Sequence, residues 1–154
     1  MRVHFSSETD DWATPAAFFG RLNSEFNFTL DPCANAFNAK CDRYFTKEDD
    51  GLAQDWSGET VFMNPPYGRA IADWIRKAYE ESRAGTTVVA LIPSRTDTRY
   101  WHDYVMRAKE IRLVKGRLKF GDGRNSAPFP SAVVIWDGFN SRLEPRLATM
   151  DNYV

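Results

Sequence analysis

Apolar residues in this chain fall into short continuous runs and into stripes with helical spacing. Continuous runs occupy 60–63, 86–92 and 132–136. Runs of this kind, without polar alternation, are typical of strands buried on both faces of a parallel sheet. Between the first two runs, apolar residues recur three or four positions apart from Arg69 to about Ala84, which predicts an amphipathic helix.

Weaker patterns add further elements around this centre. Thr14 suits a helix N-cap and Pro15 the first helical position, so a helix is predicted to begin there. The other predicted elements are a short helix at 99–108 and strands at 27–30, 43–45, 110–114 and 117–120. The order predicts a single α/β domain over 1–154, with a mostly parallel sheet closed by an antiparallel hairpin and with 1–11 and 138–154 peripheral.

Length and charge narrow the class of protein. The chain has 154 residues, 43% of them hydrophobic, which fits one domain with one core. Its net charge is −1 and its sequence pI is about 6.1, so any contact with nucleic acid must come from a local basic face. The two cysteines and two histidines lack the spacing of a zinc site. We therefore expect no metal. No signal segment or membrane-spanning run is visible, so we also expect a soluble cytoplasmic protein.

The segment Asn64-Pro65-Pro66-Tyr67 follows the run at 60–63 directly. The prolines end that strand, which leaves Asn64 at its carboxyl end, where open α/β sheets bind ligands. The side-chain oxygen of Asn64 and the Pro65 carbonyl can accept both hydrogens of an aromatic amine, and Tyr67 offers a face for stacking. Two fixed acceptors stabilise the positive charge that develops when such an amine attacks an electrophile. An Asp at position 64 would also offer an acceptor. The alternative interpretation is a turn that merely ends a strand.

This segment resembles the catalytic motif of the amino-methyltransferases that use S-adenosylmethionine. Read with other motifs, the chain resembles the phage-encoded, Dam-like DNA N6-adenine methyltransferases over roughly residues 8–137. The other motifs are Trp12-Ala-Thr-Pro15, Leu30-Asp-Pro-Cys-Ala34, Asp49-Asp-Gly-Leu52, Pro93-Ser-Arg-Thr96, Gly116-Arg-Leu-Lys-Phe120 and Ala127-Pro-Phe-Pro-Ser131. The resemblance implies a Rossmann-like methyltransferase fold and methyl transfer to N6 of an adenine flipped out of DNA. It implies catalytic roles for Asn64, Pro65, Pro66 and Tyr67.

The resemblance also implies where the cofactor S-adenosylmethionine binds. The expected contacts are Trp12, Thr14, Pro15, Asp31, Pro32, Cys33, Asp49, Asp50 and Asn64. Asp31 suits the amino group of the cofactor, and a carboxylate in the turn at 49–50 suits ribose hydroxyls or the adenine amine. The family's Asp-Pro-Phe-Ala-Gly signature is altered, because 35–38 read Asn-Ala-Phe-Asn without glycine, so the methionine part must be held differently. All three carboxylates can instead be ordinary turn residues.

A basic group near the end of the chain suggests contact with DNA. Arg117 and Lys119 lie in its densest part, flanked by Arg112 and Arg124, and Arg95 follows the strand at 86–92. We expect Arg95, Arg117 and Lys119 to contact phosphates or base edges. The alternative is that these charges are only solvated.

Several functional alternatives remain open at this stage. N4-cytosine methylation uses the same amine chemistry, and the motif also serves protein glutamine methyltransferases, although no separate domain for a protein substrate is visible. A nucleic-acid-binding module that has lost catalysis is a third alternative, which the missing glycines favour. The recognition sequence, the strandedness of the DNA and the oligomeric state are not determined by the sequence.

Overall fold

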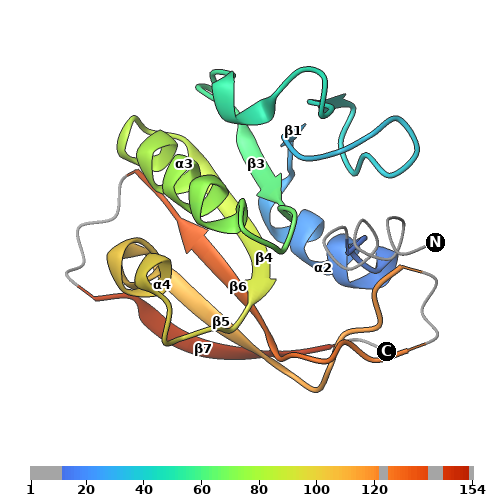
Figure 1. Cartoon of the computed structure of the whole chain (residues 1–154), viewed down its shortest axis with the longest axis vertical. Helices are drawn as coiled ribbons and strands as arrows, with labels where there is room; N and C mark the ends of the chain where they lie inside the picture. Colours follow the sequence, from blue (N-terminus) through green and yellow to red (C-terminus); the bar gives the residue numbers. More distant parts are fainter. Residues whose placement is uncertain (1–11, 122–124, 139–143, 153–154) are drawn as a thin grey trace.

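A computed structural model describes residues 12–121, 125–138 and 144–152, and contains a seven-stranded sheet in the order β2-β1-β3-β4-β6-β5-β7 (Figure 1). The strands are β1 (Leu30–Asp31), β2 (Arg43–Tyr44), β3 (Thr60–Met63), β4 (Thr87–Pro93), β5 (Glu110–Lys115), β6 (Ser131–Trp136) and β7 (Arg146–Asp151). Only β6 runs against its neighbours β4 and β5, and all other pairs are parallel. The prediction of a mostly parallel α/β sheet with an antiparallel hairpin is therefore confirmed.

The centre of the sheet is made by the apolar runs. Every residue of β6 is buried, as are all residues of β4 except Thr87. The two strands pair over six positions, among them Leu91 with Val133. Because side chains alternate between the two faces of a strand, burial of nearly every position requires cover on both faces of the sheet.

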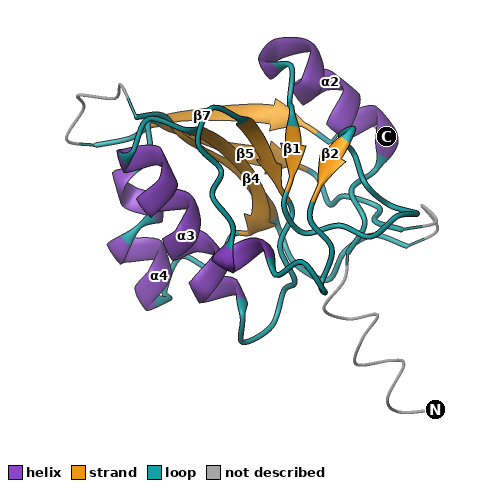
Figure 2. Ribbon diagram, turned by 90° about the horizontal axis from the view of Figure 1, so that it is seen from above, coloured by secondary structure: helices purple, strands orange, loops and turns teal. Residues whose placement is uncertain are grey.

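Helices supply that cover from both sides. The α-helices are α2 (Ala16–Phe26), α3 (Ile71–Arg83) and α4 (Arg99–Asp103), and two 3-10 turns are η1 (Gly51–Ala53) and η2 (Val105–Arg107). In Figure 2, α3 and α4 lie on one face of the sheet and α2 lies on the other. None of the helices in the described ranges combines the length and apolarity needed to cross a membrane.

Three local predictions differ from the structure. Strand β1 begins only at Leu30, because Asn27 takes a left-handed conformation that ends α2, with φ of 56°. Residues 117–120 are not a strand, although their burial alternates. Their backbone bonds instead run to other loop segments, as from Ala127 N–H to the Leu118 carbonyl at 2.8 Å. The predicted helix at 99–108 is divided into α4 and η2.

The end of the chain differs from the expected peripheral segment. Strand β7 pairs in parallel with β5 over six positions, from Glu110 with Arg146 to Lys115 with Asp151, and forms one edge of the sheet. The hydrophobic pattern hardly predicts this strand, because an edge strand that is half exposed lacks the apolar run of a buried one. The hairpin of β5 and β6 therefore lies inside the sheet. Residues 1–11, also expected to be peripheral, lie outside the described ranges, as does Arg124.

Candidate active site

Asn64 lies where the sequence places it, directly after β3, and its carboxamide is held by the segment before α2. Its Nδ2 donates to the Trp12 carbonyl and to the Thr14 hydroxyl, the latter at 2.8 Å. Its Oδ1 is buried and finds no hydrogen-bond partner among the described residues. A buried acceptor left unpaired costs about 1–3 kcal/mol, so this oxygen calls for a functional explanation.

The role of Thr14 differs from the predicted helix cap. Helix α2 begins at Ala16 after Pro15, and no side chain caps it. Thr14 is instead buried, with 4% of its surface exposed, and its hydroxyl accepts the Asn64 amide. The cap prediction was wrong because a Thr-Pro pair has the same sequence signature whether its hydroxyl bonds the helix or a distant strand.

Asp31 is the second polar group of the site. It is 5% exposed, and its two carboxylate oxygens accept backbone N–H groups of Cys33 at 3.3 Å and Lys40 at 3.1 Å. Burial raises the pKa of Asp31 above its ordinary value, partly offset by these two hydrogen bonds and by the charge of Lys40. A buried carboxyl whose lone pairs are only partly used is suited to bind a cationic or amine group.

Asn64 and Asp31 face one small cavity. Its volume is about 20 Å³, and it is lined by Trp12, Ala13, Thr14, Asp31, Cys33, Asn38, Lys40, Phe62 and Asn64. Five of the predicted cofactor residues therefore meet there. Ala13, Asn38, Lys40 and Phe62 were not predicted, and their types alone give no signal of a site. A ligand of cofactor size needs a cavity of roughly 300 Å³ or more, so the cavity as it stands accommodates only part of such a ligand.

The remaining predicted cofactor residues do not line this cavity. Asp49 accepts the N–H and hydroxyl of Thr46 at 2.8 and 2.9 Å, which lowers the pKa of Asp49. Asp50 is exposed in a left-handed conformation. The turn nevertheless lies close to Asp31, because Gly51 packs against the carbonyl of the next residue, Pro32. A Cβ added to Gly51 would lie 2.2 Å from the Pro32 carbonyl oxygen. Contact of Asp49 or Asp50 with a cofactor stays a prediction.

Tyr67 belongs to an aromatic cluster that covers the site, formed with Trp12, Phe120 and Phe129. Its ring is 8% exposed and meets Phe120 and Phe129 edge to face, with centroids 6.1 and 5.6 Å apart. Trp12 contacts the same two phenylalanines at 5.6 and 5.3 Å. Stacking of a base on Tyr67 therefore requires the aromatic cluster to open. Phe120 and Phe129 stood in motifs of the sequence, but no role was predicted for them.

The three predicted DNA-contacting residues lie on the outside of the segments that cover the site. Arg95, Arg117 and Lys119 are all exposed. Arg95 lies over the ring of Phe129 at 5.9 Å, and Arg117 donates to the Ala127 carbonyl at 3.2 Å. The structure thus places Arg95 against the aromatic cluster and Arg117 against the loop that carries Phe129, and contact of the three cations with DNA stays a prediction.

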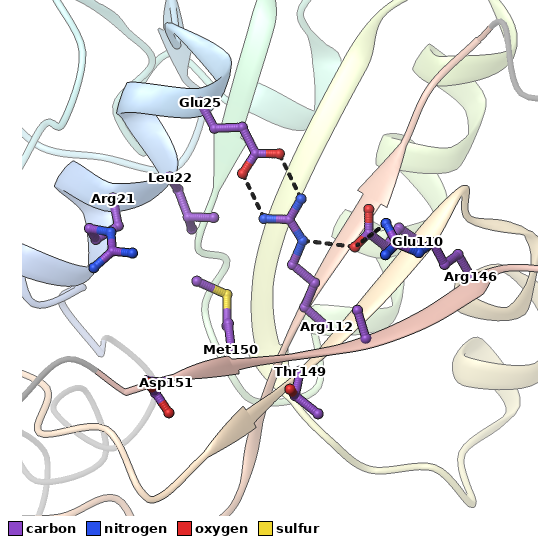
Figure 3. A pocket seen from close by; sticks show the side chains of 10 residues that line it. Arg21, Leu22, Glu25, Glu110, Arg112, Arg146, Thr149, Met150 and Asp151 are labelled. Carbon is purple, nitrogen blue, oxygen red and sulfur yellow. Dashed lines mark hydrogen bonds and ion pairs between the residues drawn. The ribbon is translucent and has the colours of Figure 1, made fainter.

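A second cavity lies away from Asn64, between α2, β5 and β7, with a volume of about 460 Å³. Arg112 bridges it: Figure 3 shows its guanidinium bonded to both oxygens of Glu25 on α2 and to Glu110. None of the predicted catalytic or cofactor residues lines this cavity. Arg112 therefore joins α2 to the sheet and does not belong to the basic surface.

Across 12–121, 125–138 and 144–152, no three His, Cys, Asp or Glu side chains gather into a group that could hold an ion. Burial raises the pKa of Cys41 to about 12, helped by the nearby carboxylates of Asp31, Asp42 and Glu59, so this thiol stays protonated at neutral pH.

Comparison with protein families decides between the alternatives. The family model described as Dam, DNA N-6-adenine-methyltransferase, matches residues 4–150. The chain belongs to the Dam family. The resemblance inferred from the motifs is thereby confirmed, and this Dam-family protein is a DNA N-6-adenine methyltransferase.

Individual relatives agree with the family assignment. A DNA N-6-adenine-methyltransferase of Haemophilus phage HP1 is 36% identical over 139 residues, which cover 85% of this chain and 80% of the relative. One of Escherichia phage T1 is 26% identical over 111 residues, and the match covers 71% of this chain but only 46% of that protein. Among solved structures, a "predicted O-methyltransferase" of Agrobacterium tumefaciens aligns with a TM-score of 0.40 and 21% identity, over 73% of this chain and 54% of the other.

Proposed function

We propose that this Dam-family protein binds S-adenosylmethionine beside Asp31 and Asn64, and that Asn64 accepts a hydrogen from the N6 amine of an adenine flipped out of DNA. The observation that carries the proposal is the buried Oδ1 of Asn64, which finds no partner among the described residues. A flipped adenine amine supplies the missing donor, because an amine N–H and a carboxamide oxygen are complementary.

The residues around the cavity suit the cofactor chemically. The carboxylate of Asp31 suits the ammonium of the methionine part, and Trp12 and Thr14 line the same space. When bound, S-adenosylmethionine supplies an electrophilic methyl group on a positively charged sulfur. Because the cavity is much smaller than the cofactor, we expect the segments around 12–14 and 33–40 to separate when it binds.

Asn64 contributes through charge and orientation. As the amine nitrogen of adenine forms its bond to the methyl group, the methyl–sulfur bond would break and leave its electron pair on a neutral thioether. The nitrogen becomes positive, and its N–H groups become stronger donors. A fixed oxygen at Asn64 stabilises that charge without having to reorient, as does the neighbouring Pro65 carbonyl in the role expected from the sequence. Proton loss follows the transfer, so no strong base is required at the site. Arg95, Arg117 and Lys119 would hold the DNA backbone on the adjacent surface.

The deciding experiment is incubation of the protein with labelled S-adenosylmethionine and unmethylated DNA, followed by analysis of the nucleosides. We expect label in N6-methyl-2′-deoxyadenosine, and far less of it when Asn64→Ala replaces the wild type. Label in N4-methylcytosine would show cytosine chemistry at the same site. DNA that stays unlabelled although the protein binds the cofactor would show that the protein is a binding module without catalysis.

A further inference from the structure

We propose that Thr14 is a positioning residue: its hydroxyl, together with the Trp12 carbonyl, holds the Asn64 carboxamide in place so that its oxygen faces the reacting amine. The proposal rests on the function proposed above, and it assigns Thr14 to the amide of Asn64 instead of to the cofactor. The hydroxyl oxygen lies 2.8 Å from Asn64 Nδ2 across 50 residues of chain.

A carboxamide has a donor end and an acceptor end of nearly equal shape, so its orientation must be set by its partners. The Trp12 carbonyl can only accept, and it receives Asn64 Nδ2. This contact sets the orientation, with Oδ1 turned away from Trp12. The Thr14 hydroxyl, which can donate or accept, here accepts from the same nitrogen and adds a second hydrogen bond that holds the amide in place. In the reversed orientation Oδ1 would meet the Trp12 carbonyl, and the amide nitrogen would meet the donor hydrogens of the adenine amine.

Thr14 is held rigidly enough for this role. Its side chain is β-branched and therefore has few rotamers, and it is buried with 4% exposed. The following Pro15 disfavours a helical backbone at Thr14, and Pro15 itself is not helical, with ψ of 136°, so Thr14 lies before α2. Since no side chain caps α2, the hydroxyl of Thr14 is available to Asn64.

Two substitutions separate the hydroxyl from the packing. Thr14→Val keeps the shape and removes the acceptor, whereas Thr14→Ser keeps the acceptor. We expect Thr14→Val to lower kcat about tenfold, the rate equivalent of one hydrogen bond, with KM for DNA and cofactor within about twofold of wild type. Thr14→Ser should restore most of the rate. A raised KM for the cofactor with unchanged kcat would instead assign Thr14 to cofactor binding and overturn the proposal.

A double-mutant cycle tests whether Thr14 acts through Asn64. In an Asn64→Ala background, Thr14→Val should cause no further loss of rate, because the amide that it orients is absent. Equal losses in both backgrounds would overturn the proposal. Thr86→Val is the matched control: Thr86 is also buried, at 2% exposed, and its hydroxyl donates to the Trp56 carbonyl at 3.3 Å. It should leave kcat at the wild-type value.

Thermal denaturation of the wild type, Thr14→Val, Asn64→Ala and the double variant tests this proposal separately from the proposed function. If the wild type methylates no adenine, the proposed function fails, and the contact is then judged from stability. Losses of Tm that are smaller in the double variant than the sum of the single ones support the pairing of Thr14 with Asn64. Additive losses show that the two groups do not interact and overturn the proposal whatever the activity.

Discussion

The phenol oxygen of Tyr67 donates a hydrogen bond to the backbone carbonyl of Leu91, with 3.0 Å between the two oxygens. This bond ties the turn after β3 to the neighbouring strand β4. Burial raises the pKa of Tyr67 well above its ordinary value, so the hydroxyl stays a donor at neutral pH. The turn after β3 is therefore anchored at Tyr67, two residues after the Pro65 carbonyl.

Tyr67→Phe removes this hydrogen bond and keeps the ring between Phe120 and Phe129. We expect a loss of about 1 kcal/mol in the free energy of unfolding and methylation near the wild-type rate. Tyr67→Ala also removes the ring, and should cost about 3–5 kcal/mol. Urea denaturation and single-turnover methylation measure both. A large loss of rate in folded Tyr67→Phe would show that the hydroxyl has a catalytic role.

Substitution of Asn64 should affect catalysis more than folding. Asn64→Ala removes the acceptor of the adenine amine, and we expect turnover to fall about a hundredfold or more, with near-normal cofactor binding. Single-turnover methylation of an adenine-containing duplex measures the loss. A wild-type rate would mean that Asn64 only ends the strand.

The Asn64→Asp variant should be less active than the sequence alone suggests. An Asp also offers an acceptor to the amine, which predicts substantial activity. In the structure, however, one carboxylate oxygen would replace Nδ2 and face the carbonyl of Trp12, where two acceptors repel. We therefore expect Asn64→Asp to recover only part of the activity, and to lose stability as pH rises and the carboxyl ionises. Activity equal to wild type would show that the Trp12 carbonyl does not control the side chain at position 64.

Asp31 should make both stability and cofactor binding depend on pH. Because its folded pKa lies above 3.8, the folded state holds the proton more tightly than the unfolded state. Its contribution to stability is therefore fully present below pH 3.8 and is lost as pH rises through the raised pKa. Asp31→Asn should remove this part of the pH dependence in thermal denaturation.

Binding of the cofactor should change in the opposite direction. Only ionised Asp31 can pair with an ammonium group, so affinity for S-adenosylhomocysteine should fall as pH drops through the raised pKa. Isothermal titration at several pH values measures it, and Asp31→Asn should bind weakly throughout. Equal affinity of Asp31→Asn and wild type would exclude Asp31 from the cofactor site.

Replacing Arg95, Arg117 and Lys119 together by Ala should weaken DNA binding and lower its dependence on salt. Each lost phosphate contact should reduce the slope of log affinity against log salt by about one. Fluorescence anisotropy with a short duplex at several salt concentrations measures this slope.

A matched control removes three exposed cations from elsewhere, Arg76, Arg83 and Arg107, which belong to α3 and η2. It changes the net charge equally and should leave the slope unchanged. Equal effects of the two triple variants would mean that only total charge matters and that the predicted contacts are solvated.

Arg112 should contribute to stability through its two carboxylate partners. Arg112→Met leaves Glu110, whose side chain is only 12% exposed, without its closest cation, and we expect a loss of about 2–3 kcal/mol. Arg146→Met is the control, because Arg146 is 64% exposed and 3.8 Å from Glu110, and should cost less than about 1 kcal/mol. Similar losses in the two variants would contradict the bridging role of Arg112.

The effect of Arg112 should also depend on pH. Its hydrogen bond lowers the pKa of Glu25 from 4.5. The stabilisation from Glu25 is therefore present above pH 4.5 and is lost as pH falls through the lowered pKa. The difference in stability between wild type and Arg112→Met should narrow over that range.

Local patterns in the sequence were enough to predict the centre of the fold and the place of Asn64. Apolar runs such as Thr87–Pro93 can be buried only between two layers, and two prolines after Met63 must end a strand. These are local properties of the chain, so the parallel sheet and its ligand-binding edge followed from them. The motifs added the family, which periodicity alone does not give.

The tertiary structure decided what surrounds Asn64. Its amide partners come from Trp12 and Thr14, about 50 residues earlier, and the aromatic cluster over the site combines positions 12, 67, 120 and 129. Thr14 has the same local signature as a helix cap, and β7 has none of the apolar continuity of a buried strand. Both were assigned by contacts between segments distant in sequence, whose hydrogen bonds and packing no local pattern contains.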